Sequence, residues 1–373
     1  MLCSNDVIHD DFGPEKIVNV YDPKTGMEGV LVIDNTARGP GKGGIRMVPD
    51  LSVSEVARLA RAMTLKNSLA DLPFGGAKSG IKRVGNESKE ELIRAFAKKI
   101  KALVPMEYIA APDINTGEYE MAAFADEIGH VNACTGKPTE LGGLPHELGS
   151  TGYGVAQSAL VAFEFAGKDA DELTIALEGF GNVGVFTARF LSEAGCKIVA
   201  VSDSKGAIYN EKGLDVAKLE KTKREKGTVT AYKDGKVLGT EKLFELKADV
   251  LIPGARPDVI NDSNKAKIRA GIIVEAANIP IQTRVEEELE NKGILIVPDF
   301  VANAGGVISS YLETINGRQS EAFPLIKEKV GQNTKLVLET ARTNKTTARK
   351  AAETIAFERV AKAMEYRGWN KRK

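Results

Sequence analysis

The chain is poor in cysteine, histidine and tryptophan: its 373 residues include three cysteines, three histidines and one tryptophan. The cysteines stand far apart, at positions 3, 134 and 196. This spacing argues against a disulfide framework and a cysteine metal site, and it indicates a reducing compartment. With so few histidines, any acid–base chemistry falls to lysine and carboxylate side chains. We therefore expect no bound metal.

The chain also lacks an excess of one charge and any apolar run long enough to span a membrane. Basic and acidic residues number 51 each, so neither a nucleic-acid partner nor a membrane surface is indicated. The first residues, MLCSNDVIHDD, are unlike a secretory signal. We expect a cytoplasmic protein, and the length favours two domains.

The first part of the chain predicts an α/β domain. Two strands are expected at 15–22 and 29–35, joined by the turn PKTG, and a third at 108–113. Helices are expected after the capping-box patterns SVSE and SKEE. Their predicted inner faces carry Val56, Leu59 and Met63 in the first helix, and Leu92, Phe96 and Ile100 in the second.

Asp113 directly follows the third strand, in a position where functional sites commonly form. An Asx-turn or a helix cap is the alternative role for this aspartate. Thr116 is expected to cap the next helix, whose inner face would hold Met121, Phe124 and Ile128.

Three lysines between residues 39 and 80 have settings that are unusual for solvated side chains. Lys42 and Lys78 lie in the glycine-rich segments GPGKGG and GGAKSG, which we predict to be turns that present a cation to a ligand. Lys66 shares the predicted inner stripe of the first helix, where an ammonium needs an anion or a lowered pKa. Exposed lysines are the alternative for all three. A phosphate-binding P-loop is excluded, because neither segment fits G-x-x-x-x-G-K-[ST].

From Leu173 onward, apolar strands alternate with helices, which predicts a parallel sheet covered on both faces. Residues 228–239 predict an inserted hairpin that turns at Asp234-Gly235, and the chain beyond about residue 325 is expected to be helical. The predicted fold class is α/β. The first domain spans 1–150, a doubly wound domain spans 151–344, and the C-terminal helix at 345–373 packs back on the first domain.

A dinucleotide signature follows the first strand of the second domain. The motif is Gly179-Phe180-Gly181-Asn182-Val183-Gly184, and it opens a helix, where a pyrophosphate would bind. Asp203 ends the next strand and would bind the adenosine ribose hydroxyls. A tight packing turn is the alternative. Asp203 disfavours NADP, but Ser204 and Lys205 follow it and could hold a 2′-phosphate, so NAD and NADP both stay open.

Longer motifs resemble those of a known family from about residue 14 to the C-terminus. GPGKGGIRMVP, MTLKNSLADLPFGGAKSG, APDINTGEYEM, TGKPTELGG, TGYGV, GFGNVG and NAGGVISSYLE look like successive motifs of the glutamate dehydrogenases, within the Glu/Leu/Phe/Val amino-acid dehydrogenase superfamily. The resemblance implies a substrate and oligomerisation domain, a Rossmann-like domain, NAD or NADP as cofactor, and a homo-oligomer, typically a hexamer. The implied reaction is oxidative deamination of L-glutamate to 2-oxoglutarate and ammonia, and its reverse.

The resemblance also implies roles for individual residues. Lys78 and Asp113 match the catalytic lysine and aspartate, and Lys66 the lysine that holds the substrate α-carboxylate. Lys42 and Ser310 match the pair that grips the side-chain carboxylate. The remaining matches are Ala111 and Thr151 in the substrate pocket, Asn303 near substrate and nicotinamide, and Asn278 at the cofactor.

In the implied mechanism Lys78 acts as a base on water, and Asp113 shuttles a proton on the amino nitrogen. The pKa of Lys78 would have to fall from ~10.4 toward ~7–8, and we expect Lys42 and Lys66 to lower it. Two features depart from the glutamate enzymes. The segment before the lysine stretch is short, as in the leucine and phenylalanine enzymes, and EAANIP differs from the EGANGP run that is common in glutamate enzymes.

Three alternatives stay open. The first is a dehydrogenase of another amino acid, such as aspartate, leucine or valine. The second is a non-catalytic homologue that binds only nucleotide or a partner, which loss of Lys78 or Asp113 would have supported. The third, a 2-hydroxy-acid dehydrogenase, usually needs a histidine, and neither His130 nor His146 has a recognisable catalytic setting.

Overall fold

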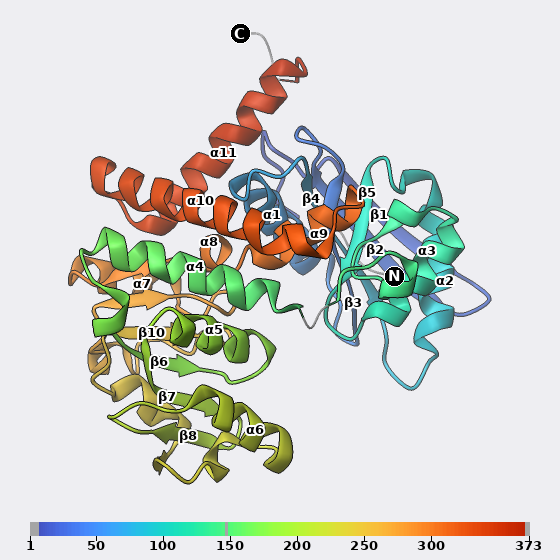
Figure 1. The fold of residues 1–373 in the computed structure, drawn as a ribbon. Coiled ribbons are helices and arrows are strands. Elements are labelled where there is room, and N and C mark those ends of the chain that lie inside the picture. Colours follow the sequence, from blue (N-terminus) through green and yellow to red (C-terminus); the bar gives the residue numbers. More distant parts are fainter. Residues whose placement is uncertain (1–6, 146–147, 370–373) are drawn as a thin grey trace. The chain divides into compact units, whose positions relative to one another are not determined.

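A computed structural model describes residues 7–145 and 148–369, and the chain divides into two compact units (Figure 1). Unit 1 comprises residues 1–148, 309–321 and 353–373, and unit 2 comprises residues 149–308 and 322–352. Residues 309–321 therefore cluster with unit 1, whereas the sequence placed them in the second domain. His146 lies outside the described residues.

Unit 1 is built on a five-stranded mixed sheet with the strand order β1-β2-β4-β3-β5. The strands are β1 (Lys16–Asp22), β2 (Met27–Asn35), β3 (Gly41–Val48), β4 (Gly75–Lys82) and β5 (Tyr108–Pro112). β2 pairs antiparallel with β1 and β4, whereas β3 runs parallel to β4 and β5. The strands predicted at 15–22, 29–35 and 108–113 are confirmed.

Helices cover both faces of this sheet. The helices of unit 1 are α1 (Val53–Leu69), α2 (Lys89–Ile100) and α3 (Glu118–Ile128). Successive residues of β2 point to opposite faces, as strand geometry requires. Leu31 and Ile33 join the core that α2 and α3 cover, whereas Val30 and Val32 join the core formed with α1. The predicted inner faces of α2 and α3 are buried, as expected.

The starts of α1 and α2 also follow the predicted capping patterns. The hydroxyl of Ser52 accepts from the Glu55 amide, and that of Ser88 accepts from the Glu91 amide. The prediction for Thr116 was wrong. Its hydroxyl donates to a carbonyl of β3 at 2.7 Å, and the residue before the first residue of α3 is Gly117.

The predicted inner stripe of α1 was partly wrong. Leu59 and Met63 are only partly buried. The helix buries smaller and more polar residues: Val53, Val56, Ala57, Ala60, Thr64, Asn67, Ser68 and Leu69. Glycines in the strands let this face lie close to the sheet, since a Cβ on Gly76 would overlap Thr64.

The two glycine-rich lysine segments are strands and not turns. Lys42 lies in β3 and Lys78 in β4. A Cβ on Gly43 would overlap the Ala77 carbonyl oxygen, and one on Gly75 would overlap the Asn35 carbonyl oxygen. These glycines therefore allow the close approach of neighbouring backbone in the sheet, a role that glycine also has in strands.

Unit 2 is built on a seven-stranded sheet with the order β12-β11-β10-β6-β7-β8-β9. The strands are β6 (Thr174–Glu178), β7 (Lys197–Asp203), β8 (Gly206–Tyr209), β9 (Lys236–Leu238), β10 (Val250–Pro253), β11 (Ile272–Val274) and β12 (Leu295–Val297). β12 to β7 run parallel, as predicted. The hairpin predicted at 228–239 is absent from this described segment. β9 pairs antiparallel with β8, a short strand that the sequence analysis missed.

The helices of the second half of the chain are α4 (Ser150–Phe165), α5 (Asn182–Glu193), α6 (Val216–Lys226), α7 (Thr283–Asn291), α8 (Asp299–Ala302), α9 (Gly305–Thr314), α10 (Ala322–Asn344) and α11 (Ala348–Tyr366). α10 lies along α4 (Figure 1), and Tyr153 stacks on Phe323 between them at 4.3 Å. α9 and α11 have residues in both units. Among the described residues, no helix is both long and apolar enough to cross a membrane.

Candidate active site

One face of the unit 1 sheet carries the predicted catalytic lysine. In β3, Ile45 and Met47 belong to the core under α2 and α3. The alternating residues Lys42, Gly44 and Arg46 therefore point to the opposite face, where α1 packs. Lys78 of β4 reaches the same face, since its ammonium lies 3.3 Å from where a Cβ on Gly44 would stand.

Lys78 and Asp113 form an ion pair on this face. The Lys78 Nζ lies 2.9 Å from the Asp113 Oδ2, and the lysine is only 6% exposed. β3 runs between the two strands that supply these residues. The pair can form across β3 because Gly44 has no side chain there: an added Cβ would be 2.7 Å from the Asp113 Cβ.

Arg46 completes this charged group. Its Nε donates to the Asp113 carboxylate at 3.0 Å, and its guanidinium bonds the Glu55 carboxylate at 2.5 Å. Burial lowers the pKa of Lys78, while Asp113 acts to raise it. The largest cationic contribution to the lowered pKa is from Arg46, and not from Lys42 or Lys66 as predicted.

The pKa of Asp113 is also set by its two cationic neighbours. Burial alone would raise this pKa, but the charges and hydrogen bonds of Lys78 and Arg46 outweigh burial and lower it. Asp113 is therefore held as a carboxylate beside an ammonium whose charged form burial disfavours.

Lys42 is buried, with 2% exposure. Its Nζ donates to the Thr135 hydroxyl at 2.9 Å and lies 5.8 Å from the centre of the Phe74 ring. Burial lowers the pKa of Lys42 to about 8, and the charge of Glu313 opposes that shift. Among the described residues no carboxylate lies within salt-bridge distance of this ammonium.

A second buried lysine lies beside this site. Lys137 Nζ is 2.5 Å from the Glu313 Oε1 and donates to the Cys134 carbonyl at 2.7 Å. The Gly136 amide donates to the Glu313 Oε2 at 2.8 Å. Neither Lys137 nor Glu313 was predicted as a site residue from the sequence, although they lie in the motifs TGKPTELGG and NAGGVISSYLE.

The other unit 1 residues predicted for the site lie on the same elements. Lys66 is half-buried in the last turn of α1, next to Asn67, whose amide donates to the Lys42 carbonyl at 3.4 Å. Ala111 of β5 pairs with Gly44 of β3. Ser310 lies on α9 three residues before Glu313, so the two residues share a helix face.

In unit 2, the glycine motif forms the expected loop between β6 and α5. Gly179 has a φ of +94°, in the region that favours glycine, and α5 begins after Gly181. A Cβ on Gly184 would overlap the Gly179 carbonyl oxygen, whereas nothing lies within 4 Å of a Cβ on Gly181. This geometry fits a dinucleotide pyrophosphate. The turn is tight, the space beside Gly181 is unobstructed, and the first amides of α5 have no partner within the helix.

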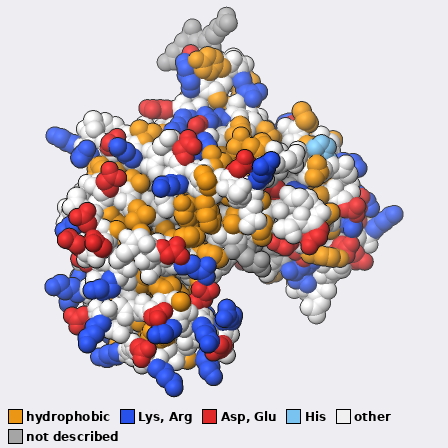
Figure 2. Space-filling view, in the orientation of Figure 1, with side chains coloured by type: hydrophobic (Ala, Val, Ile, Leu, Met, Phe, Trp, Pro, Cys, Tyr) orange, Lys and Arg blue, Asp and Glu red, His pale blue; other side chains and the backbone are white. Residues whose placement is uncertain are grey.

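Asp203, at the end of β7, already has several hydrogen-bond donors. Its Oδ2 accepts from Lys223 Nζ at 2.5 Å and from the Val229 amide at 2.8 Å, and its Oδ1 accepts from the Lys205 amide at 2.9 Å. These contacts lower the pKa of Asp203 against the effect of burial. Lys223 belongs to α6, and Figure 2 shows Lys and Arg side chains gathered over the region of this helix. Ser204 follows Asp203 directly and is exposed.

Two of the remaining predicted residues of unit 2, Asn278 and Asn303, follow β11 and β12 in the chain. Asn303 Nδ2 donates to the Asn278 side-chain oxygen at 3.1 Å. Thr151, in the first turn of α4, lies beside Gly306, where an added Cβ would be 2.8 Å from its hydroxyl. Arg349 binds the carboxylates of Glu275, Glu286 and Asp299.

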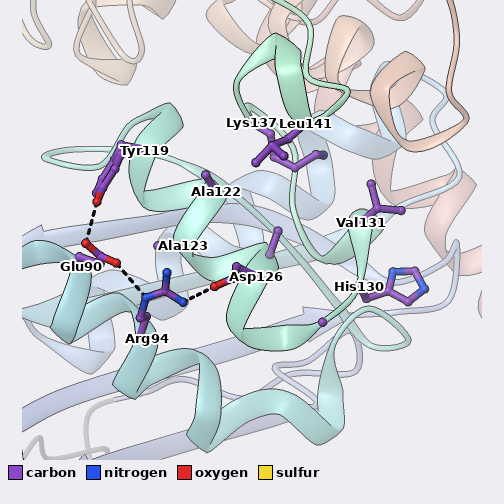
Figure 3. Close-up of a pocket in the computed structure, with 12 residues that line it drawn as sticks. Glu90, Arg94, Tyr119, Ala122, Ala123, Asp126, His130, Val131, Lys137 and Leu141 are labelled. Atoms are coloured by element: carbon purple, nitrogen blue, oxygen red, sulfur yellow. Dashed lines mark hydrogen bonds and ion pairs between the residues drawn. The ribbon is translucent and has the colours of Figure 1, made fainter.

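Unit 1 has a separate surface pocket of about 500 Å³ between α2 and α3 (Figure 3). Arg94 bridges Glu90 and Asp126 there, and Tyr119 donates to Glu90. None of the twelve residues that line it is a predicted site residue. Lys137 is one of the lining residues and pairs with Glu313, but Glu90, Arg94 and Asp126 bond to one another, so we do not assign this pocket to the reaction.

Family models match most of the chain. Residues 14–130 match the Glu/Leu/Phe/Val dehydrogenase dimerisation domain, and residues 142–368 match Glutamate/Leucine/Phenylalanine/Valine dehydrogenase. The chain belongs to this family. The chain therefore has the fold of the amino-acid dehydrogenases, which includes a Rossmann-like unit, as the sequence resemblance implied.

Curated relatives with similar sequences are named glutamate dehydrogenases. A glutamate dehydrogenase of Aeropyrum pernix is 43% identical over 356 residues, 90% of this chain and 85% of the relative. An NADP-specific glutamate dehydrogenase of Saccharolobus shibatae is 38% identical over 381 residues, 95% and 90% of the two chains. A solved hetero-hexameric glutamate dehydrogenase from Thermus thermophilus is 29% identical, with a TM-score of 0.83 over 95% of this chain and 90% of that one.

Proposed function

We propose that this enzyme oxidatively deaminates L-glutamate to 2-oxoglutarate and ammonia with NAD or NADP, and catalyses the reverse reaction. The observation that carries the proposal is the buried Lys42 ammonium, on the same sheet face as the Lys78–Asp113 pair. A buried ammonium without a carboxylate of its own favours a substrate that brings one. Relatives at 38–43% identity bear the name glutamate dehydrogenase.

The substrate would be held at both ends. Lys66 would bind the α-carboxylate, while Lys42 and Ser310 would bind the side-chain carboxylate. Ala111 and Thr151 would complete the pocket, and Asn303 would orient the substrate.

The glycine motif fits a dinucleotide, and its residues 179–184, with Asp203, Ser204 and Asn278, would hold it. When bound, NAD or NADP supplies the two-electron oxidant for the amino acid. The helix-start amides of α5 would bind the pyrophosphate, because they carry partial positive charge and have no partner within the helix.

Proton transfer would fall to Lys78 and Asp113. Neutral Lys78 would accept a proton from the water that attacks the substrate carbon, which a lowered pKa favours. Asp113, at 2.9 Å from that ammonium, would exchange a proton with the substrate nitrogen and stabilise the lysine when it is protonated.

The test is steady-state kinetics with glutamate and both oxidised cofactors. Lys78→Ala and Asp113→Asn should each lower turnover by several orders of magnitude, since general acid–base groups contribute about 10²–10⁴-fold each. Lys82→Ala, an exposed lysine at the end of the same strand, is the matched control and should leave turnover unchanged. Near-normal deamination by either site variant would contradict the assignment.

The second candidate, a dehydrogenase of an aliphatic amino acid or aspartate, is tested in the same assay. Lys42→Leu should weaken glutamate far more than leucine or norvaline, since only glutamate brings a carboxylate to the ammonium. Equal losses for all three substrates would remove the argument from Lys42.

We also propose a cytoplasmic homo-hexamer that assembles through unit 1. The match of residues 14–130 to a dimerisation domain supports assembly through this unit. Light scattering coupled to size exclusion tests it, with a mass near six chains of 40.0 kDa expected.

A further inference from the structure

We infer that Lys137 and Glu313 determine the charge of the accepted substrate: Lys137 binds the Glu313 carboxylate and so keeps the Lys42 ammonium available for the substrate's side-chain carboxylate. This inference rests on the proposed function. It gives a specificity role to two residues outside the set that the family resemblance identified.

The Lys137 and Glu313 side chains are buried, and their charged groups form an ion pair and hydrogen bonds. The Lys137 and Glu313 side chains are 3% and 2% exposed, and their ion pair is 2.5 Å long. Both carboxylate oxygens of Glu313 accept hydrogen bonds from the segment of residues 135–137: Oε1 accepts from Lys137 Nζ, and Oε2 accepts from the Gly136 amide. The same segment carries Thr135, whose hydroxyl holds Lys42 Nζ at 2.9 Å.

The three charged groups act on one another. Glu313 raises the pKa of Lys42 and Lys137 lowers it, so both charges reach the Lys42 ammonium. Two ammonium groups and one carboxylate leave one positive charge without a buried counter-charge. A dicarboxylate amino acid supplies that counter-charge, whereas a neutral side chain leaves it uncompensated, which is costly in a buried site.

Lys137 therefore limits the electrostatic effect of the Glu313 carboxylate on the Lys42 ammonium. If Lys137 loses its ammonium, the buried Glu313 carboxylate lacks its cation and lies within the electrostatic reach of Lys42. The cluster is then neutral before any substrate arrives. A substrate carboxylate would bring a second negative charge, and glutamate would bind poorly.

A double-mutant cycle tests this charge balance. Lys137→Met should lower kcat/KM for glutamate at least tenfold, through KM, and leave kcat/KM for norvaline unchanged or higher. Adding Glu313→Gln removes the competing carboxylate, so the double variant should recover glutamate to within a few-fold of the wild type. Equal losses for both substrates in Lys137→Met, or a double variant no better than the single one, would overturn the inference.

Two further measurements keep the test decisive. If Lys137→Met does not fold, Glu313→Gln alone should retain glutamate within about threefold and lose norvaline further, because the site then carries two positive charges. A purely structural role for the pair predicts equal losses instead. Calorimetric binding of glutarate, which cannot be deaminated, should follow the same order across the variants. If the wild type does not oxidise glutamate, the proposed function fails, while the order of glutarate affinities still decides the role of Lys137.

Discussion

At the scale of single residues, the proposed catalytic pair, Lys78 and Asp113, can form because Gly44 has no side chain. Gly44 sits between Lys78 and Asp113, and an added Cβ would lie 2.7 Å from the Asp113 Cβ and 3.3 Å from the Lys78 Nζ. We expect Gly44→Ala to push the pair apart and to lower kcat at least tenfold, since small misplacements of reacting groups are costly. Gly85→Ala, where an added Cβ meets only ordinary contacts at 3.5 Å, is the control. Equal kcat values for the two variants would show that Gly44 is not needed for the pairing.

Lys42 gives the enzyme a pH dependence that only acidic substrates should report. The protonated ammonium would bind the substrate carboxylate, and its pKa is about 8. As the pH rises above about 8, the free enzyme loses this charge, and kcat/KM for glutamate should fall up to tenfold per pH unit. Lys78 must be neutral to act as a base, so its lowered pKa limits turnover on the acidic side for every substrate. The ratio of kcat/KM for glutamate to that for norvaline therefore isolates Lys42. A ratio that stays constant from pH 7 to 9.5 would contradict the role of this ammonium.

The site residues also show which features could be predicted from the sequence and which contacts could not. Lys42, Lys78 and Asp113 could be selected because each stands in an unusual local context. The partners of these residues could not, because they come from distant parts of the chain. Thr135 is 93 positions from Lys42, and Glu313 is 176 positions from Lys137. Only the fold brings such groups together, and no local pattern encodes the contact.

At the scale of elements, the parallel strands of unit 2 and the amphipathic α2 followed directly from periodicity. The errors arose where glycine and short strands are ambiguous. Glycine in a lysine-containing segment predicts a turn, but β3 and β4 use it for close packing in a sheet. β8 has four residues, too few for an alternating pattern to stand out, and its pairing with β9 depends on tertiary structure.

Helix α6 should influence the choice of cofactor. Its Lys223 neutralises the Asp203 carboxylate at 2.5 Å, at the strand end where the adenosine ribose would bind. We expect Lys223→Met to expose that negative charge and to lower kcat/KM for NADP at least tenfold relative to NAD, because the carboxylate would repel a 2′-phosphate. Lys221→Met, on the same helix and 66% exposed, is the matched control. An unchanged NADP to NAD ratio in Lys223→Met would exclude α6 from cofactor selection.

At the scale of the whole molecule, the chain begins in unit 1, builds unit 2 and returns to unit 1 with its last helix. The C-terminal part of α11 forms a small hydrophobic cluster of its own in unit 1: Val360 and Met364 pack with Ala37, and Phe357 contacts Phe12 with the ring centroids 4.8 Å apart. This cluster of unit 1 therefore cannot form until the C-terminal segment is made. The sequence predicted that this helix would return, but its docking site on α1 has no local signature.

The docking of α11 on α1 leads to a stability prediction. The Arg359 guanidinium donates to the carbonyls of Ser68 and Leu69 at 3.0 and 2.7 Å, two of the last four carbonyls of α1. The Ser68 carbonyl also accepts from the Asp71 amide at 3.0 Å. Arg359→Met should lower the free energy of unfolding of unit 1 by about 1–3 kcal/mol, because it removes two charge-assisted hydrogen bonds and leaves the Leu69 carbonyl without this donor. KM for glutamate should rise as well, since Lys66 lies in this last turn. Lys362→Met is the control: its ammonium pairs with Glu365 on the same exposed face of α11, and the expected change is within about 0.5 kcal/mol. Urea unfolding measures the change in the free energy of unfolding. Hydrogen exchange of the α1 amides shows whether that change is local to this helix. If α1 exchanges equally slowly in both variants, the C-terminal helix does not hold this turn in place.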